Sequence, residues 1–156
     1  MFSYTDLHGN GVELSFKKNA FALTPSHVLV LAKMNGKWLL TKHRVRGLEF
    51  PGGKQEENET LEQAAEREVM EETGATIEDI RWFATYVVQQ KPAFGKAVFL
   101  ANVTKVEERE WMETEGAVFL TDDELMSCEM LSFHMKDVGM QKILEKVRER
   151  EDQWSY

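Results

Sequence analysis

Three glutamates near the middle of the chain are spaced so that their carboxylates can act together. Glu68, Glu71 and Glu72 lie in the stretch REVMEETGA, which follows a glycine-rich turn. A helix rotates by about 100° per residue, so Glu71 and Glu72 lie at about −60° and about +40° from Glu68 around the helix. Leu61 and Ala65 fall on the same side. We therefore expect the three carboxylates to point toward the domain body or a cleft.

Clustered carboxylates of this kind favour a bound cation. Like charges one helical turn apart repel each other by a few kcal/mol at an effective dielectric constant of about 20, and a divalent cation reverses the sign of that term. Oxygen ligands select hard ions, and Mg²⁺ held by a few carboxylates usually meets the phosphates of a substrate, with Mn²⁺ as a substitute. The alternative, a solvated acidic helix face, accounts for the remaining glutamates of the segment, Glu56, Glu57, Glu62 and Glu66.

Residues 53–75 resemble the Nudix box, which reads Gly, five residues, Glu, seven residues, and then Arg-Glu-apolar-any-Glu-Glu-any-Gly-apolar. Every fixed position matches, and Val69 and Ala75 occupy the two apolar positions. Seven fixed positions would match by chance in a chain of this length with a probability on the order of one in a million. The matching residues are Gly53, Glu59, Arg67, Glu68, Glu71, Glu72 and Gly74.

Other stretches extend the resemblance along the chain. LEFPGGK before the box, the predicted hairpin and the chain length are similar to the MutT-type branch of the family. GKWLL, RGLEFPGGK, REVMEETGA and SFHMKD resemble, more narrowly, the YtkD-type nucleoside triphosphatases of Gram-positive bacteria. The resemblance implies an α/β Nudix fold, with a mixed β-sheet sandwiched between α-helices. It also implies Mg²⁺ or Mn²⁺ dependence and hydrolysis of a nucleoside diphosphate linked to another group.

The resemblance assigns metal-binding roles to individual residues. Glu68 and Glu72 would be the principal metal ligands, and Glu71 would bind directly or through water. The carbonyl of Gly52 would complete this shell. MutT-type enzymes carry a further glutamate on a loop before a strand, and EWMETEGAVFL offers Glu113 and Glu115 there. The spacing to Phe119 favours Glu113.

The resemblance also implies catalytic and structural roles. Glu68 would help to deprotonate the attacking water, while Arg67 would pair with a neighbouring glutamate and orient it. Together with Glu71, these two residues form the expected catalytic set. The structural positions of the motif are Gly53, Glu59 and Gly74.

Basic and aromatic residues near the box could bind the substrate. The cations Lys42, His43, Arg44 and Arg46 precede the glycine-rich turn, and Lys54 follows it inside the box. Surface pairing explains most basic residues, so we expect only Lys54 to bind phosphate. Outside the box, Phe133 and Asp137 in SFHMKD could read a purine edge or simply begin a helix, and His134 has no catalytic motif around it.

Composition bounds the class of protein. A chain of 156 residues with 42% hydrophobic residues suits a single domain over residues 1–156. The net charge of −8 argues against binding long nucleic acid through a broad basic surface. Residues 54–72 alone hold eight glutamates against two basic residues, so the acidity is mostly local. The single cysteine, Cys128, and the lack of a long apolar run favour a cytoplasmic protein that does not span a membrane.

The apolar patterns predict strands interleaved with two main helices. Asn35-Gly36 predicts a hairpin, because both residues tolerate positive φ. One helix should begin after a Thr60 cap and end at Gly74, a second should run from about Ser132 to Arg150, and a short turn should follow Thr121. The predicted strands are 12–16, 28–32, 38–41, 82–88, 98–103 and 117–120.

The favoured function is therefore metal-dependent hydrolysis of nucleoside triphosphates to nucleoside monophosphate and pyrophosphate, with oxidised purine nucleotides such as 8-oxo-dGTP among the substrates. Two alternatives stay open. The protein could remove pyrophosphate from RNA 5′-triphosphate ends, which needs only local contacts. It could instead be a non-catalytic Nudix-like module that binds nucleotides, since fold does not fix function, although the complete set of glutamates argues against this.

Overall fold

The structure is a computed structural model that describes residues 1–107 and 114–150. One mixed sheet forms its centre, with strand order β1-β2-β7-β8-β3-β4-β5, while β6 pairs with β3 and β9 pairs with β4. Among these pairs β3 and β8 run parallel, and the other ladders are antiparallel. The strands are β1 (Phe2–Thr5), β2 (Gly11–Ser15), β3 (His27–Met34), β4 (Lys37–His43), β5 (Gly47–Glu49), β6 (Gly52–Lys54), β7 (Ala75–Val88), β8 (Phe94–Val106) and β9 (Thr114–Leu120).

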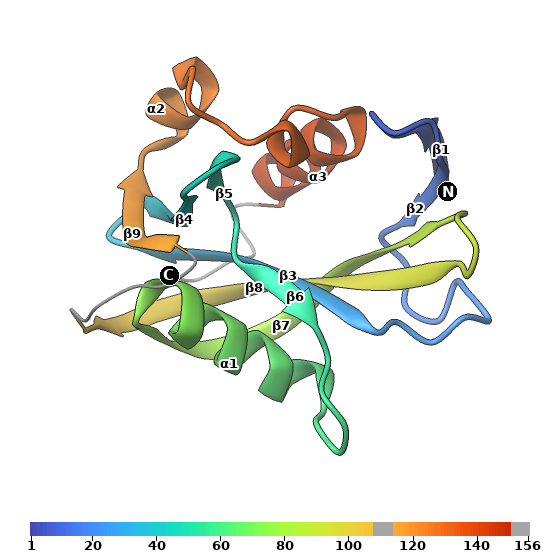
Figure 1. Cartoon of the computed structure of the whole chain (residues 1–156), viewed down its shortest axis with the longest axis horizontal. Helices are drawn as coiled ribbons and strands as arrows, with labels where there is room; N and C mark the ends of the chain where they lie inside the picture. The colour runs from blue at the N-terminus through green and yellow to red at the C-terminus, as the bar shows by residue number, and fades with distance from the viewer. Residues whose placement is uncertain (108–113, 151–156) are drawn as a thin grey trace.

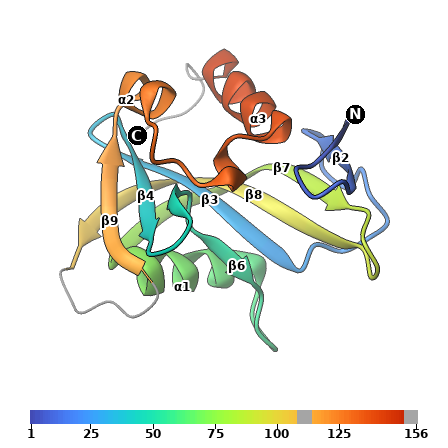
Figure 2. The same ribbon diagram turned by 45° about the horizontal axis from the view of Figure 1, so that its top comes forward.

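Helices cover both faces of the sheet (Figure 1). The helix α1 (Leu61–Thr73) lies on one face, and α2 (Asp122–Ser127), the 3₁₀ helix η1 (Phe133–Met135) and α3 (Val138–Glu149) lie on the other. The tilted view in Figure 2 shows the same three layers. The predicted α/β sandwich is therefore confirmed. None of the described helices is long and apolar enough to cross a membrane.

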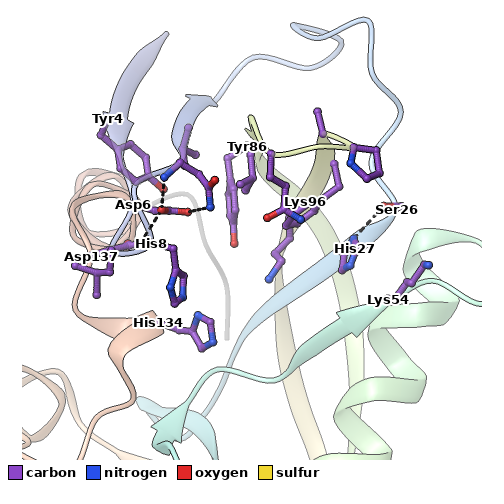
Figure 3. A pocket seen from close by; sticks show the side chains of 18 of the residues that line it. Tyr4, Asp6, His8, Ser26, His27, Lys54, Tyr86, Lys96, His134 and Asp137 are labelled. Atoms are coloured by element: carbon purple, nitrogen blue, oxygen red, sulfur yellow. Dashed lines mark hydrogen bonds between the residues drawn. The ribbon is translucent and has the colours of Figure 1, made fainter.

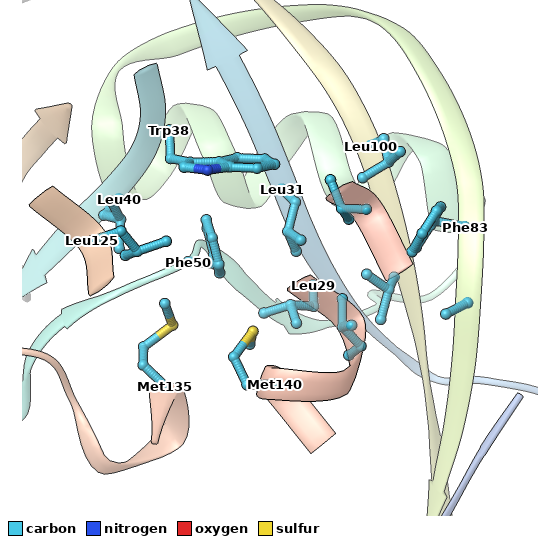
Figure 4. Close-up of a cluster of buried hydrophobic side chains, with 14 of the residues drawn as sticks. Leu29, Leu31, Trp38, Leu40, Phe50, Phe83, Leu100, Leu125, Met135 and Met140 are labelled. Carbon is cyan, nitrogen blue, oxygen red and sulfur yellow. The ribbon is translucent and has the colours of Figure 1, made fainter. Parts of the chain in front are cut away.

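Each layer encloses its own hydrophobic core. Between the sheet and α1, Ala64, Ala65 and Val69 are fully buried against strand residues such as Val30 and Phe99. The opposite core is larger and contains Trp38, Phe50, Met135 and Met140 among its side chains (Figure 4). Small alanines on α1 let that helix pack close to the sheet, so the carboxylates that follow them on the same helix are held near β6.

Local sequence signals act as predicted at the ends of α1. The Thr60 hydroxyl accepts a hydrogen bond from the Gln63 backbone, and the Gln63 side chain accepts one from the Thr60 backbone. Gly74 ends the helix with φ of 74°. The hairpin between β3 and β4 likewise has Asn35 and Gly36 at positive φ.

The structure corrects two predictions. The helix expected from about Ser132 to Arg150 is broken, because Ser132 caps the short η1 and the Asp137 carboxylate caps a new helix, α3, by accepting from the Met140 backbone at 2.8 Å. The strand predicted at 82–88 begins earlier, since β7 starts at Ala75 directly after the Gly74 cap. The short strands β1, β5 and β6 were not predicted; each has five residues or fewer and too little alternation to show in the sequence.

Candidate active site

Two glycines of β6 allow the α1 glutamates to approach the sheet. A Cβ atom on Gly53 would lie 2.5 Å from the Glu68 carboxylate, and one on Gly52 would lie 2.3 Å from the Val28 carbonyl oxygen. Both distances are far below contact distance, so a larger residue at either position would displace the carboxylate or the strand. The glycine-rich turn therefore serves close packing of β6 between β3 and α1.

Arg67 organises the carboxylates around this turn. Its guanidinium donates two hydrogen bonds to Glu59 and one, at 2.8 Å, from Nη1 to Oε1 of Glu68. Nη2 also donates to the carbonyl of Lys54 at 3.0 Å, and Nη1 lies 3.3 Å from Oε2 of Glu71. Hydrogen bonds to these carboxylates raise the pKa of Arg67, and they lower the pKa of Glu59 to about 2. Arg67 thus joins the box loop to the helix.

Glu68 and Glu72 form a close carboxyl pair on the inner side of α1. Burial, a hydrogen bond with Glu68 and the negative charge of that neighbour together raise the pKa of Glu72 to about 9, and burial is the largest of these causes. The Gly52 backbone amide donates to Oε1 of Glu72 at 3.4 Å, which opposes the rise only partly. The pair therefore holds a proton at neutral pH unless another positive charge replaces it.

This donor set fits a hard divalent cation. Two carboxylates in contact, with the carbonyl of Gly52 in the adjoining strand, provide oxygen ligands, and Mg²⁺ commonly uses one or two carboxylates while it keeps several waters. A cation would also remove the repulsion that raises the Glu72 pKa. Over residues 1–107 and 114–150, no three acidic, histidine or cysteine side chains converge as a complete metal site.

The other predicted ligands occupy different surroundings. The side chain of Glu71 is 56% exposed, compared with 14% for Glu68, and it lies on the Arg67 side of the helix. The expectation that all three carboxylates point inward is therefore wrong for Glu71: Glu68 and Glu72 form a partly buried pair, and Glu71 is solvent-exposed because it lies on the Arg67 side of the helix. Glu113 lies outside the residues that the structure describes.

A cavity of about 670 Å³ opens beside the box (Figure 3). The side chain of Lys54, predicted to bind phosphate, lines it. A smaller cavity of about 170 Å³ is lined by Gly52 and Gly53, the glycines that contact Glu72 and Glu68. Four residues line both spaces and connect them: Tyr86, Lys96, His134 and Asp137. We call the two connected spaces the substrate cavity.

Opposite walls of the substrate cavity differ in charge. On the wall nearest the box lie Lys54, Lys96 and His27, and burial together with the two lysine charges lowers the pKa of His27. On the facing wall lie Asp6 and Asp137, and burial raises the pKa of Asp137. Figure 3 shows these groups projecting from β3, β6 and β8 on one side and from the N-terminal segment and α3 on the other. A ligand with an anionic end and a neutral polar end matches this arrangement.

Sequence reasoning missed several lining residues. Lys96 enters the cavity because β8 pairs with both β3 and β7, which sets it opposite His27 and Tyr86. No motif surrounds it, so only the strand register brings it to the box. Among the cations considered near the turn, Arg46 pairs with Glu49 at 2.6 Å and lines the smaller space.

Comparison with known proteins agrees with this geometry. The family model described as the NUDIX domain matches residues 23–148. A protein of Bacillus subtilis (strain 168) named "Putative 8-oxo-dGTP diphosphatase YtkD" is 39% identical over 153 residues, which cover 96% of this chain and 97% of that protein. The crystal structure of the Bacillus subtilis pyrophosphohydrolase BsRppH, solved as a mutant, superposes with a TM-score of 0.86 at 38% identity, covering 96% and 97% of the two chains. A NUDIX hydrolase from Nitrosomonas europaea shares the fold, with a TM-score of 0.66 at 22% identity over 85% of this chain and 97% of its own.

Proposed function

This chain belongs to the Nudix family of hydrolases, and we propose that it is a metal-dependent pyrophosphohydrolase that converts nucleoside triphosphates into nucleoside monophosphate and pyrophosphate. One observation carries the proposal. The partly buried Glu68–Glu72 pair adjoins the smaller space of the substrate cavity through Gly52 and Gly53, and cationic side chains line the near wall of the larger space of about 670 Å³ that connects with it. Small-molecule sites usually have volumes of this order.

The cationic wall would bind the phosphate chain. Lys54 extends from β6 and Lys96 from β8, so their ammonium groups approach the cavity from two directions. A bound Mg²⁺ ion would neutralise phosphate oxygens around the attacked phosphorus. With the triphosphate held between these groups, its reacting phosphorus would lie toward Gly52 and Gly53.

Proton transfer would fall to Glu68. Arg67 donates to Oε1 of Glu68 at 2.8 Å, which fixes the carboxylate that would accept a proton from the attacking water. Glu59 holds Arg67 in turn, so it acts as a positioning residue. Arg67 and Glu71 complete the set of residues that we assign to the reaction.

The facing wall would bind the base. Asp6, Asp137 and His134 offer hydrogen-bond groups to a base edge, and the ring of Phe133 offers a surface for stacking. YtkD is named for 8-oxo-dGTP, so oxidised and normal purine triphosphates are the first substrates to test. Removal of pyrophosphate from RNA 5′ ends is the second candidate, and the groove described below favours it.

A panel of nucleotides tests the proposal. Turnover should require Mg²⁺ or Mn²⁺ and should stop with chelator, and the products should be nucleoside monophosphate and pyrophosphate. Hydrolysis in ¹⁸O-labelled water should place the label in pyrophosphate if water attacks the β-phosphorus, and in the nucleotide if it attacks the α-phosphorus. Label in orthophosphate would overturn the assigned bond. Nucleotide binding without turnover under every condition would favour a non-catalytic module instead.

A further inference from the structure

A second groove lies next to the substrate cavity, between the β1–β2 edge of the sheet and α3. Its volume is about 600 Å³. The same helix that carries Asp137 at its start runs along these strands, as Figures 1 and 2 show. We define the basic groove by six of its lining residues, which are Phe2, Phe16, Lys17, Lys142, Lys146 and Arg150.

Cations and aromatic rings alternate within the basic groove. Lys142, Lys146 and Arg150 are four residues apart, so they project from one face of α3. The ammonium nitrogens of Lys142 and Lys146 lie 5.5 Å from the ring centres of Phe2 and Phe16, respectively. The Arg150 guanidinium lies 5.9 Å from the centre of the Phe16 ring. These contacts hold the charged groups in a row without neutralising them.

The positive charges of the groove remain available to a ligand. Lys142 and Lys146 pair with Glu145 and Glu149 at 3.7 Å and 3.2 Å, but both glutamates are more than half exposed. Exposed ion pairs contribute little to stability, so a phosphate can displace them. Within residues 1–107 and 114–150, neither Lys17 nor Arg150 forms an ion pair. This concentration of positive charge contrasts with the net charge of −8 on the whole chain.

The groove continues the line of the substrate cavity. Phe2 lines the groove and Tyr4 lines the cavity, and their rings lie 5.7 Å apart on the same strand. Tyr4 packs directly on Gly139 in the first turn of α3, where a Cβ atom would lie 1.9 Å from its hydroxyl oxygen. From Lys142 to Arg150, the residue that caps α3, the eight steps along the helix cover about 12 Å. An extended ligand that leaves the substrate cavity over Tyr4 would therefore next contact the cations of the basic groove.

We propose that the basic groove binds the single-stranded nucleic acid that continues from a 5′ nucleotide held in the substrate cavity. The direction in which the nucleic acid runs, from the substrate cavity to the basic groove, rests on the proposed function, in which the triphosphate binds at the box. A row of cations interleaved with half-buried aromatic rings suits a phosphodiester backbone that is bound without reading sequence. An acidic peptide would use the same cations but would not continue from a nucleotide held in the substrate cavity.

Binding can be measured without catalysis. The probe is a single-stranded oligoribonucleotide of about ten nucleotides, within the site sizes of single-strand-binding proteins, labelled at its 3′ end and followed by fluorescence anisotropy across salt concentrations. The double variant Lys146→Gln/Arg150→Gln should bind about 10-fold more weakly at low salt. Its slope of log affinity against log salt should fall in magnitude by about 1.4, because about 0.7 is lost per cation on a single strand. Equal affinity and slope would overturn the proposal.

Two further variants separate charge from folding. Lys37→Gln/Lys105→Gln removes two cations from other parts of the sheet and should leave binding unchanged. Lys146→Arg keeps the charge over Phe16 and should bind like the wild type. If the double variant Lys146→Gln/Arg150→Gln has a lower melting temperature than the wild type, the single variant Lys146→Gln decides the outcome. Its slope of log affinity against log salt should change by about half as much as expected for the double variant. Loss of polyglutamate binding with unchanged oligonucleotide binding would show that the groove serves an acidic peptide, and would overturn the proposal.

Turnover distinguishes this proposal from the proposed function. The double variant Lys146→Gln/Arg150→Gln should have a higher KM for a 5′-triphosphorylated oligonucleotide than the wild type. Its kcat and KM for the free nucleoside triphosphate should be unchanged. If the wild type binds the oligonucleotide through the groove but hydrolyses neither substrate, the proposed function fails and the groove assignment stands. If both substrates are hydrolysed and the variant affects neither, the groove assignment fails alone.

Discussion

Arg67 binds Glu59 through two parallel hydrogen bonds, from Nε to Oε2 at 2.7 Å and from Nη2 to Oε1 at 2.9 Å. Glu59 precedes the α1 cap, so this contact ties the loop to the helix eight residues later. It leaves Nη1 of Arg67 to meet Glu68 from a fixed direction. The Glu59–Arg67 pair therefore orients Glu68, the carboxylate that we propose for proton transfer, although Glu59 itself does not line the substrate cavity.

Glu59→Gln should lower kcat without unfolding the domain. Loss of one charged partner lets the Arg67 guanidinium turn away from Glu68, and supporting contacts of this kind are worth about 10- to 100-fold in activity or metal affinity. Steady-state kinetics across Mg²⁺ concentrations measure the change. Glu66→Gln, on the exposed face of the same helix, is the control and should be neutral. Equal kinetics for Glu59→Gln and the wild type would show that Arg67 holds Glu68 without this partner.

Glu72→Gln should abolish turnover and change the pH dependence of stability. Because the pKa of Glu72 is raised to about 9 from 4.5, its favourable contribution to the metal-free fold is complete below pH 4.5 and is lost as pH rises toward 9. In chelator, the melting temperature of the wild type should therefore fall over this range more than that of the variant. Parallel melting curves for the two proteins would contradict a buried carboxyl pair.

Mg²⁺ should raise the melting temperature of the wild type. A ligand at 100 times its Kd stabilises the native state by about 2.7 kcal/mol, which corresponds to about 5–10 °C for a domain of this size. Differential scanning calorimetry measures the shift. Glu72→Gln should show a much smaller shift at the same Mg²⁺ concentration. An unchanged melting temperature of the wild type across a wide Mg²⁺ titration would count against metal binding.

Lys96→Gln should lower kcat/KM for the nucleoside triphosphate. Loss of the ammonium group should reduce this value by about 10- to 100-fold, because a hydrogen bond to a charged group contributes about 1.5–3 kcal/mol. Lys54→Gln, on the same wall, should act in the same direction. Lys37→Gln removes an equivalent charge outside the cavity and should leave kcat/KM unchanged. If Lys96→Gln behaves like this control, the phosphate chain does not reach the junction of the two spaces.

Glu113 and Glu115 can be separated by matched substitutions. If Glu113 completes the metal site, Glu113→Gln should reduce turnover far more than Glu115→Gln, because it removes a ligand charge near the phosphate. Turnover at several Mg²⁺ concentrations measures both variants. Equal or reversed effects would remove Glu113 from the assigned ligands.

The sequence by itself determined the helix of the box and its chemistry. Thr60 and Gln63 form a reciprocal cap, and Gly74 takes the positive φ that ends the helix, because both signals act within a few residues. The inward direction of Glu68 likewise follows from helical periodicity. The same locality explains why the Asn35-Gly36 hairpin could be predicted.

Only the tertiary structure decided which groups meet these residues. The 40-residue separation of Glu68 from Val28, which pairs with Gly53, leaves no local signal, and Lys96 reaches the box through strand register alone. The break before α3 has a different, local cause, because Ser132 and Asp137 cap separate helices there and apolar spacing does not record caps. Periodicity records which face of an element is apolar, but it does not record which distant element covers that face. The charge of each cavity wall was therefore settled by strand pairing and helix packing.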